Sequence, residues 1–411
     1  MIKAPLVALA LACCSLSVTG CDLIKSLTDK KGSSSEEAEG DGEKGEKKKK
    51  KGERESIEGC ELPEGSISAD LTIKKGCKVE IDRDLTVSGG AVVTIEAGAT
   101  LAFASERYLA IDDAKLVVKG TEKEPVVFTS SNRSKAKGDW VGVFLQGTTM
   151  AGTRIEHARF EYAGREASGG HGALTINDQN TAKRIAIVNS VFENNDRAAV
   201  WVSGEKASFA EFSGNRLEKN GRSLVAPAHV LGSIGAGNRF GDPIETRGDV
   251  TETTTWPAFG VPVYLSENLR VLGSGSAPTL TLTRGTELRF ASATYFSVGE
   301  DRGGALVAPG CTFTSANETP SAGDWVGFFF YKNTQRVDLS GATIAAAGHD
   351  ASGGRAAITL YDVDAKDARN VSLAGLTVKD TRVAALASPN NDCAPLAGPI
   401  TAVGVPVCRA E

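Results

Sequence analysis

The chain lacks a second long apolar run after its first residues, and it lacks the short motifs that mark the common enzyme classes. It contains no G-x-S-x-G elbow, no H-E-x-x-H pair and no glycine-rich phosphate loop. It also has no C-x-x-C pair and no Cys/His spacing typical of zinc. The formal net charge of −5 gives no broad basic field for binding nucleic acid. We therefore expect no cofactor and no nucleic-acid partner.

The N-terminal residues have the order of a targeting signal. Lys3 is followed by an apolar run from Ala4 to Leu16 that is too short to span a bilayer, and then by small residues and Cys21. This segment resembles a bacterial lipoprotein signal over residues 1–20, which implies lipidation of Cys21 and attachment to the membrane through acyl chains. An ordinary secretory signal, with Cys21 incidental, is the alternative.

Residues 21–57 are polar and of low complexity, so we expect a lipidated, disordered linker. Its five-lysine run, Lys47–Lys51, suits either anionic lipid or a solvated spacer, and the neighbouring glutamates favour the spacer. Five further cysteines follow in the exported part of the chain, where disulfides can form. Cys60 and Cys77 bracket the start of the folded region and Cys393 and Cys408 bracket its end, so the sequence predicts two local disulfides. Cys311 is left as a small buried apolar residue.

From about residue 58 the sequence is rich in glycine, threonine and β-branched residues, with apolar residues alternating in short runs. This period of two predicts strands, and no sustained helical period appears after the signal. Phe192 and Phe212, each followed by asparagine, suggest a repeat of about 20 residues and therefore a solenoid coil. Asparagines at repeated turns favour hydrogen-bonded ladders.

A second repeat has a period of about 190 residues and preserves the order of its blocks, which indicates an internal duplication. The matching pairs are VTIEAGATLAFAS (93–105) with LTLTRGTELRFAS (280–292), GDWVG (138–142) with GDWVG (323–327), and GALTIND (172–178) with AAITLYD (356–362).

These blocks, together with TTTW (253–256) and KGTEKEPVVFTSS (119–131), resemble bacterial surface proteins of the right-handed parallel β-helix class. The resemblance covers most of residues 75–390 and implies an all-β, single-stranded, pectate-lyase-like solenoid. That fold is shared by lyases, hydrolases, adhesins and passive surface proteins, so it does not give a function by itself. We expect a first copy with an N-terminal cap at residues 58–246, a second copy at 247–391 and a C-terminal cap at 392–411.

Three groups of residues are candidates for a site. In GDWVG, Asp139, Trp140, Asp324 and Trp325 either contact a sugar or form a structural corner. In the second copy, Asp362, Asp364 and Asp367 are spaced D-x-D-x-x-D without the glycine and glutamate of a calcium loop, so they are weak metal candidates.

The third group lies in two similar glycine-rich stretches, AGREASGGHG (163–172) and AGHDASGGRA (347–356). Arg165 and His171 of the first become His349 and Arg355 in the second, so the histidine and arginine exchange places. Catalysis depends on where each group sits, so the exchange favours a duplicated turn. An anionic partner held by both loops is the other interpretation.

The sequence thus favours a non-catalytic, lipid-anchored protein of the bacterial cell envelope, on the outer membrane or the periplasmic face of the inner membrane. Its expected role is structural or in interactions, with the membrane and a glycan or envelope protein as partners. A carbohydrate-binding protein and a polysaccharide lyase or hydrolase are the alternatives. Aromatic side chains aligned along one face would favour glycan binding, and three convergent carboxylates beside a lysine or arginine would favour an enzyme.

Overall fold

The computed structural model describes residues 56–147, 151–178, 182–204, 207–273, 275–351, 353–390 and 392–409. The signal segment, Cys21 and the charged linker up to residue 55 lie outside these ranges. Residues 54–411 form one compact unit. In the part of the chain that is described, no helix is long and apolar enough to cross a membrane.

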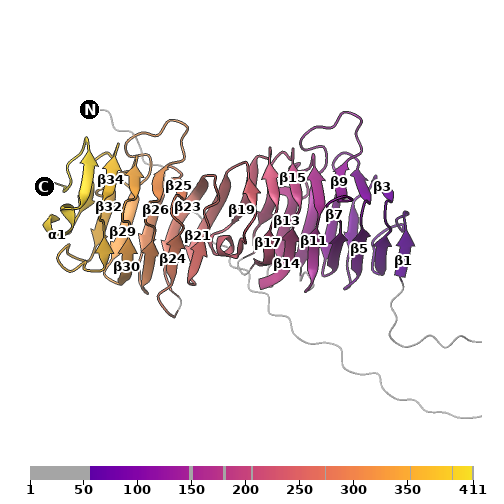
Figure 1. Cartoon of the computed structure of the whole chain (residues 1–411), viewed down its shortest axis with the longest axis horizontal. Coiled ribbons are helices and arrows are strands. Elements are labelled where there is room, and N and C mark those ends of the chain that lie inside the picture. Colours follow the sequence, from indigo (N-terminus) through magenta and orange to yellow (C-terminus); the bar gives the residue numbers. More distant parts are fainter. Residues whose placement is uncertain are drawn as a thin grey trace, which may run out of the picture. The chain divides into compact units, whose positions relative to one another are not determined.

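Short strands follow one another along the chain and pair in parallel with the strand one coil later (Figure 1). In the first copy they form three sheets. Sheet A comprises β1 (Ser56–Gly59), β2 (Asp70–Ile73), β5 (Val92–Glu96), β8 (Lys115–Lys119), β11 (Thr153–Glu156), β14 (Ala182–Val188) and β17 (Ser208–Ser213). Sheet C comprises β3 (Lys78–Ile81), β6 (Thr100–Phe103), β9 (Val126–Ser130), β12 (Ala158–Glu161), β15 (Val191–Glu193), β18 (Arg216–Glu218) and β20 (Arg239–Phe240).

Sheet B runs through both copies. It begins with β4 (Leu85–Val87), β7 (Tyr108–Asp112), β10 (Gly142–Gly147), β13 (Gly172–Asp178), β16 (Ala198–Val202), β19 (Arg222–Pro227), β21 (Ile244–Val250) and β23 (Val263–Val271). One branch then continues as β25 (Glu287–Phe290), β28 (Thr312–Ser315), β31 (Thr343–Ala345), β34 (Leu376–Lys379) and β36 (Ile400–Val403). The other branch is β26 (Tyr295–Val298), β29 (Gly327–Tyr331), β32 (Ile358–Tyr361) and β35 (Leu386–Ala387).

The remaining sheet, D, belongs to the second copy and comprises β22 (Thr254–Trp256), β24 (Thr279–Leu282), β27 (Gly304–Val307), β30 (Thr334–Asp338) and β33 (Val371–Ser372). A 3-10 helix, η1 (Ala228–Ser233), and a short α1 (Ala394–Ala397) are the helices of the described residues. This architecture is a parallel β-helix solenoid, as the sequence predicts.

The boundary expected near residue 247 falls inside β21, and the sheet branches at the next strand, β23. Residues 244–246 of β21 pair with Val263–Leu265, the part of β23 that pairs with β25. Residues 248–250 pair with Leu269–Val271, the part of β23 that pairs with β26. By the sequence match, β25 corresponds to β6 of sheet C and β26 to β7 of sheet B. The second copy therefore joins the first with a shift of one strand position, which the sequence repeat does not reveal.

Alternate strand residues point inward because side chains alternate across a strand. The inward residues form one continuous apolar core along the coils. Within it Phe128, Phe160 and Phe192 stack on successive coils, with ring centroids 4.5 and 4.7 Å apart. The expectation that Phe192 and Phe212 lie one repeat of about 20 residues apart is wrong, because Phe192 lies in sheet C and Phe212 in sheet A. Residues paired between successive strands of a sheet are 14 to 37 positions apart, since turns of different length interrupt the strands.

The expected asparagine ladder is present at the turns. Asn195 donates through Nδ2 to Oδ1 of Asn220 at 2.9 Å, and Asn220 donates in turn to Asp242 at 3.3 Å. Asn215 accepts from the Ser190 N–H and donates to the Ile187 carbonyl. Such buried amides satisfy backbone groups that a turn leaves without a sheet partner.

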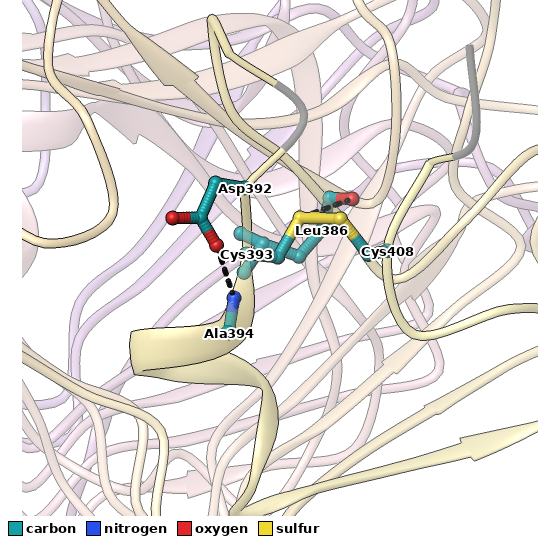
Figure 2. Close-up of a disulfide and its surroundings, with 5 residues drawn as sticks. All are labelled: Leu386, Asp392, Cys393, Ala394 and Cys408. Atoms are coloured by element: carbon teal, nitrogen blue, oxygen red, sulfur yellow. Dashed lines mark hydrogen bonds between the residues drawn. A yellow bond between two sulfur atoms is a disulfide. The ribbon is translucent and has the colours of Figure 1, made fainter.

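Both predicted disulfides are confirmed: Cys60 bonds to Cys77, and Cys393 bonds to Cys408. Figure 2 shows the second one beside Leu386 of β35 and the start of α1, where Asp392 accepts from the Ala394 N–H at 3.2 Å. The N–H of Leu386 donates to the Val407 carbonyl, so the C-terminal segment covers the end of β35. Cys311 is free and buried, as predicted.

Candidate functional site

The two glycine-rich loops occupy equivalent turns, between β12 and β13 and between β31 and β32. Gly164 and Gly348 both have a φ of +96°, and each approaches the backbone N–H of an arginine, Arg197 or Arg382, so a side chain would collide there. The Gly164 N–H donates to the Val141 carbonyl, and the second copy repeats this bond at 3.1 Å. What the two loops share is therefore their backbone geometry.

The charged groups of the two loops have different surroundings. Arg165 forms an ion pair with Glu106 at 2.7 Å, and His171 lies 3.5 Å from the Arg197 guanidinium. In the second copy, His349 lies near Asp324 and helps to lower the pKa of that carboxyl group. Arg355 has its backbone N–H bonded to the Thr359 hydroxyl. The duplicated turn therefore carries two different sets of side chains rather than one repeated site.

The GDWVG tryptophans are packing residues, which corrects the possibility that they stack on sugars. Trp140 and Trp325 are both 0% exposed and stack on Phe103 and Phe290, with ring centroids 4.1 Å apart in each copy. Each indole N–H donates 2.8 Å to a backbone carbonyl, of Glu161 or Ala345. No ring face is left for a ligand.

The aspartates of this motif form turns. Asp139 accepts from the Ala136 N–H at 3.0 Å, and Asp324 accepts from the Ser321 N–H at 2.9 Å. Burial acts to raise the pKa of Asp324, but hydrogen bonds, the first from Ser315, and the nearby His349 lower it overall. These bonds close the loops after β9 and β28, which both project beyond the strands on the upper side of Figure 1.

The three aspartates of the second copy do not converge. Asp364 accepts from the Asn390 side chain at 2.7 Å and lies 3.8 Å from Lys366, whereas Asp362 and Asp367 line separate hollows. Among the described residues, no group of three or more His, Cys, Asp or Glu side chains is placed to hold a metal ion. The strand ends at Tyr361, so these residues lie in a turn and do not share a strand face.

The outer face of β26, β29 and β32 carries a cluster that sequence reasoning missed. Phe296, Phe328, Phe330 and Leu360 point into the core, so the residues alternating with them point outward. The outward residues form what we call the aromatic patch: Tyr295, Phe329, Tyr331 and Tyr361. Phe329 lies 5.3 Å from Tyr295, 6.4 Å from Tyr331 and 6.5 Å from Tyr361, and the two last tyrosines are 5.0 Å apart. Phe329 is buried at 2% exposed, whereas Tyr361 is 43% exposed and is the one aromatic ring among the described residues that is largely open to solvent.

Two open hollows adjoin the aromatic patch. The Tyr331 hollow has a volume of about 590 Å³ and is lined by Glu300, Asp301, Tyr331, Lys332, Asn333, Tyr361 and Asp362. The Tyr295 hollow has a volume of about 540 Å³ and is lined by Gly248, Asp249, Glu267, Asn268, Arg270, Thr294 and Tyr295. Each therefore offers at least one ring beside carboxylate, amide and cationic groups.

Burial and neighbouring charges keep Tyr331 and Tyr295 protonated. Burial, together with the neighbouring Glu300, raises the pKa of Tyr331 to about 12. Burial and Glu300 also raise the pKa of Tyr295, against the opposing effect of Arg270. Arg270 is itself held by Asp249 through two hydrogen bonds of 2.8 and 2.7 Å. The phenol groups are therefore hydrogen-bond donors at neutral pH and cannot act there as bases.

The first copy has no equivalent of this patch in full. In the registers of β10 and β13, Gln146 pairs with Asn177, where the second copy pairs Tyr331 with Tyr361. The sequence does carry a signal for the aromatic patch: GVFLQ (142–146) in the first copy corresponds to GFFFY (327–331) in the second. Alternate residues of a strand share a face, so Phe329 and Tyr331 lie on the same side of β29.

A family model described as the pectate-lyase like beta helix domain matches residues 65–176. No curated protein and no solved structure matches the chain. The chain is a parallel β-helix. The matched residues belong to the first copy of this β-helix, so the match does not reach the aromatic patch.

Proposed function

We propose that this protein is a non-catalytic, lipid-anchored component of the bacterial cell envelope whose β-helix binds a carbohydrate chain at the aromatic patch. The observation that carries the proposal is the exposed Tyr361 ring, next to Tyr331 and above a hollow lined with carboxylate and amide groups. Sugar rings pack their C–H faces on aromatic rings, while their hydroxyl groups need polar partners at the edge. The Tyr331 hollow supplies both within one open surface.

The anchoring part of the proposal rests on the N-terminal sequence. Lys3, the apolar run and the small residues before Cys21 occur in the order of a lipoprotein signal. Replacing Cys21 by serine should move the protein from the membrane fraction to the soluble fraction of the envelope. A wild-type distribution for the variant would contradict lipid anchoring. Asp22 follows Cys21, and in some Gram-negative bacteria an aspartate at that position of a lipoprotein keeps it in the inner membrane. An Asp22→Ser variant tests this sorting role, because it should change which membrane holds the protein without releasing it.

The binding part is tested by giving the second copy the residues of the first. The double variant Tyr331→Gln/Tyr361→Asn places at both positions the side chains that β10 and β13 carry in the same register. Screening the full chain with Cys21→Ser on a glycan array should identify a ligand, and the double variant should lose at least ten-fold in affinity for it. Gln146→Ala in the first copy is the control and should bind like the parent.

Polysaccharide cleavage is the second candidate, because Glu300, Asp301 and Asp362 line the same hollow as Lys332. Two carboxylates can serve as acid and base in glycoside hydrolysis, and a lysine can accept a proton in elimination. A depolymerisation assay on the ligand from the array decides between the two: activity that disappears in Glu300→Gln or Asp362→Asn would overturn the non-catalytic proposal.

A further inference from the structure

The Tyr331 hollow carries more negative than positive charge. Its charged lining residues are Glu300, Asp301, Asp362 and Lys332. Within the part of the chain that the structure describes, none of them forms an ion pair. In the Tyr295 hollow, by contrast, Arg270 neutralises the Asp249 carboxylate through two hydrogen bonds. The Tyr331 hollow is thus left with a net negative charge.

The charged residues come from the turns that follow three paired strands. Glu300 and Asp301 follow β26, Lys332 follows β29 and Asp362 follows β32. Because these strands pair in parallel, their turns meet at one edge of the sheet. The Ser297 hydroxyl, on the outer face of β26, donates to Oε2 of Glu300 at 3.2 Å and holds that carboxylate beside the aromatic patch.

The aromatic rings lie within reach of this charge. Burial, and after it the charges of Glu300 and Asp362, raise the pKa of Tyr331 to about 12. Tyr361 lies 5.0 Å from Tyr331 and is 43% exposed, so its ring is open to a ligand in the hollow. A ring face attracts cations because of its negative quadrupole, and a nearby carboxylate adds to that attraction. An aromatic surface beside unpaired carboxylates is therefore complementary to a positively charged ligand.

We infer that the carbohydrate bound here carries protonated amino groups, as an oligosaccharide of glucosamine does; this inference rests on the proposed function. An ammonium group in the hollow donates charge-assisted hydrogen bonds to Glu300 and Asp362, while its sugar ring packs on Tyr361. A polyuronate instead brings its own carboxylates next to those of the hollow, and the like charges repel each other. A neutral sugar gains the ring contact but pairs none of the charges.

The test measures the binding of three sugar hexamers by isothermal titration calorimetry to the full chain with Cys21→Ser. The probes are the glucosamine hexamer, the N-acetylglucosamine hexamer, which keeps the sugar rings but loses the charge, and the galacturonate hexamer. At about pH 6 the amino groups are protonated and the carboxylates are ionised. The glucosamine hexamer should bind about ten-fold more tightly than its N-acetyl form, and galacturonate should bind most weakly. Equal or tighter binding of either other probe, or no binding of the glucosamine hexamer, would overturn the inference.

Two double variants distinguish a failure of this inference from a failure of the carbohydrate site. Glu300→Gln/Asp362→Asn keeps the size of both side chains and removes two charges. It should lose about ten-fold in affinity for the glucosamine hexamer and leave the affinity for the N-acetyl form unchanged. If the folded variant binds glucosamine like the parent, the inference is wrong and the carbohydrate site stands. Tyr331→Gln/Tyr361→Asn keeps the carboxylates, so parental binding of every probe by this variant would refute the carbohydrate site itself.

Glu64→Gln/Glu122→Gln is the matched control for charge. Both glutamates are exposed in the first copy and neither lines the hollow, so this variant loses the same two charges at a distance from the patch. It should bind the glucosamine hexamer like the parent. A loss equal to that of Glu300→Gln/Asp362→Asn would mean that the overall charge of the protein attracts the ligand, which contradicts the inference.

Discussion

The residues of this protein are of two kinds: those whose side chains pack inside the coils and those whose side chains face the solvent. The repeated tryptophans belong to the first kind. Trp140 stacks in parallel on Phe103 at an interplanar angle of 6° and donates its indole N–H to a carbonyl. Replacing Trp140 by alanine should lower the free energy of unfolding by about 3–5 kcal/mol, because a large buried ring leaves a cavity and an unpaired carbonyl.

Chemical denaturation measures that loss, and Trp140→Phe should lose less because it keeps the ring contact. Trp201→Ala should lower the free energy of unfolding much less than Trp140→Ala, since Trp201 is half-buried on the outer face. Equal losses at Trp140 and Trp201 would contradict the division between coil residues and surface residues.

A second prediction at this scale concerns Tyr331. Its pKa is raised to about 12 in the folded protein, above the ordinary value of 10. The unfolded chain therefore ionises first, and stability from this group is fully present below pH 10 and is lost as the pH rises from 10 to 12. Comparing alkaline unfolding of the wild type with Tyr331→Phe isolates this contribution, because Cys311, whose burial raises its pKa to about 11, is common to both. Identical pH profiles would contradict it.

At the scale of elements, the turns are held by side chains that replace sheet hydrogen bonds. Asn220 accepts from both the backbone and side-chain N–H of Asn195, and it donates to the Phe192 carbonyl and to Asp242. Asn220→Ala should therefore destabilise the protein by about 2–4 kcal/mol, since it leaves buried groups unpaired. The exposed Asn370→Ala is the control, expected within about 0.5 kcal/mol of the wild type. Thermal unfolding of both variants gives the comparison.

The elements also show what the sequence can and cannot predict. Period-two runs and ordered repeat blocks are enough to predict strands, coils and duplication, because each depends on local alternation and on matching residues. The branching of sheet B at β23 is not predictable, since it depends on which half of a long strand pairs with which neighbour. The aromatic patch was missed for a related reason: Tyr331 and Tyr361 are 30 residues apart in the chain and meet only when the register is known.

On the scale of the whole molecule, the two copies kept the same coil-forming residues, whereas the residues on their outer faces diverged. The two copies share the buried Trp–Phe stack and the turn glycines, whereas the outward positions became Gln146 and Asn177 in one copy and Tyr331 and Tyr361 in the other. Packing along the coils constrains the core positions, while substitutions at outward positions cost little stability. Functional differences between the copies are therefore expected on the outer faces.

The ends of the solenoid depend on the disulfides, because a terminal coil has a neighbour on one side only and exposes strand edges. Cys393–Cys408 closes a segment whose separation is 15 residues and holds the Val407 region against Leu386. Replacing both cysteines by serine should lower stability by about 3 kcal/mol and loosen β35 and β36 before the rest of the chain. Hydrogen exchange checks this: faster exchange should be confined to residues after about 376. Faster exchange spread evenly through both copies would instead mean that the solenoid unfolds as one cooperative unit.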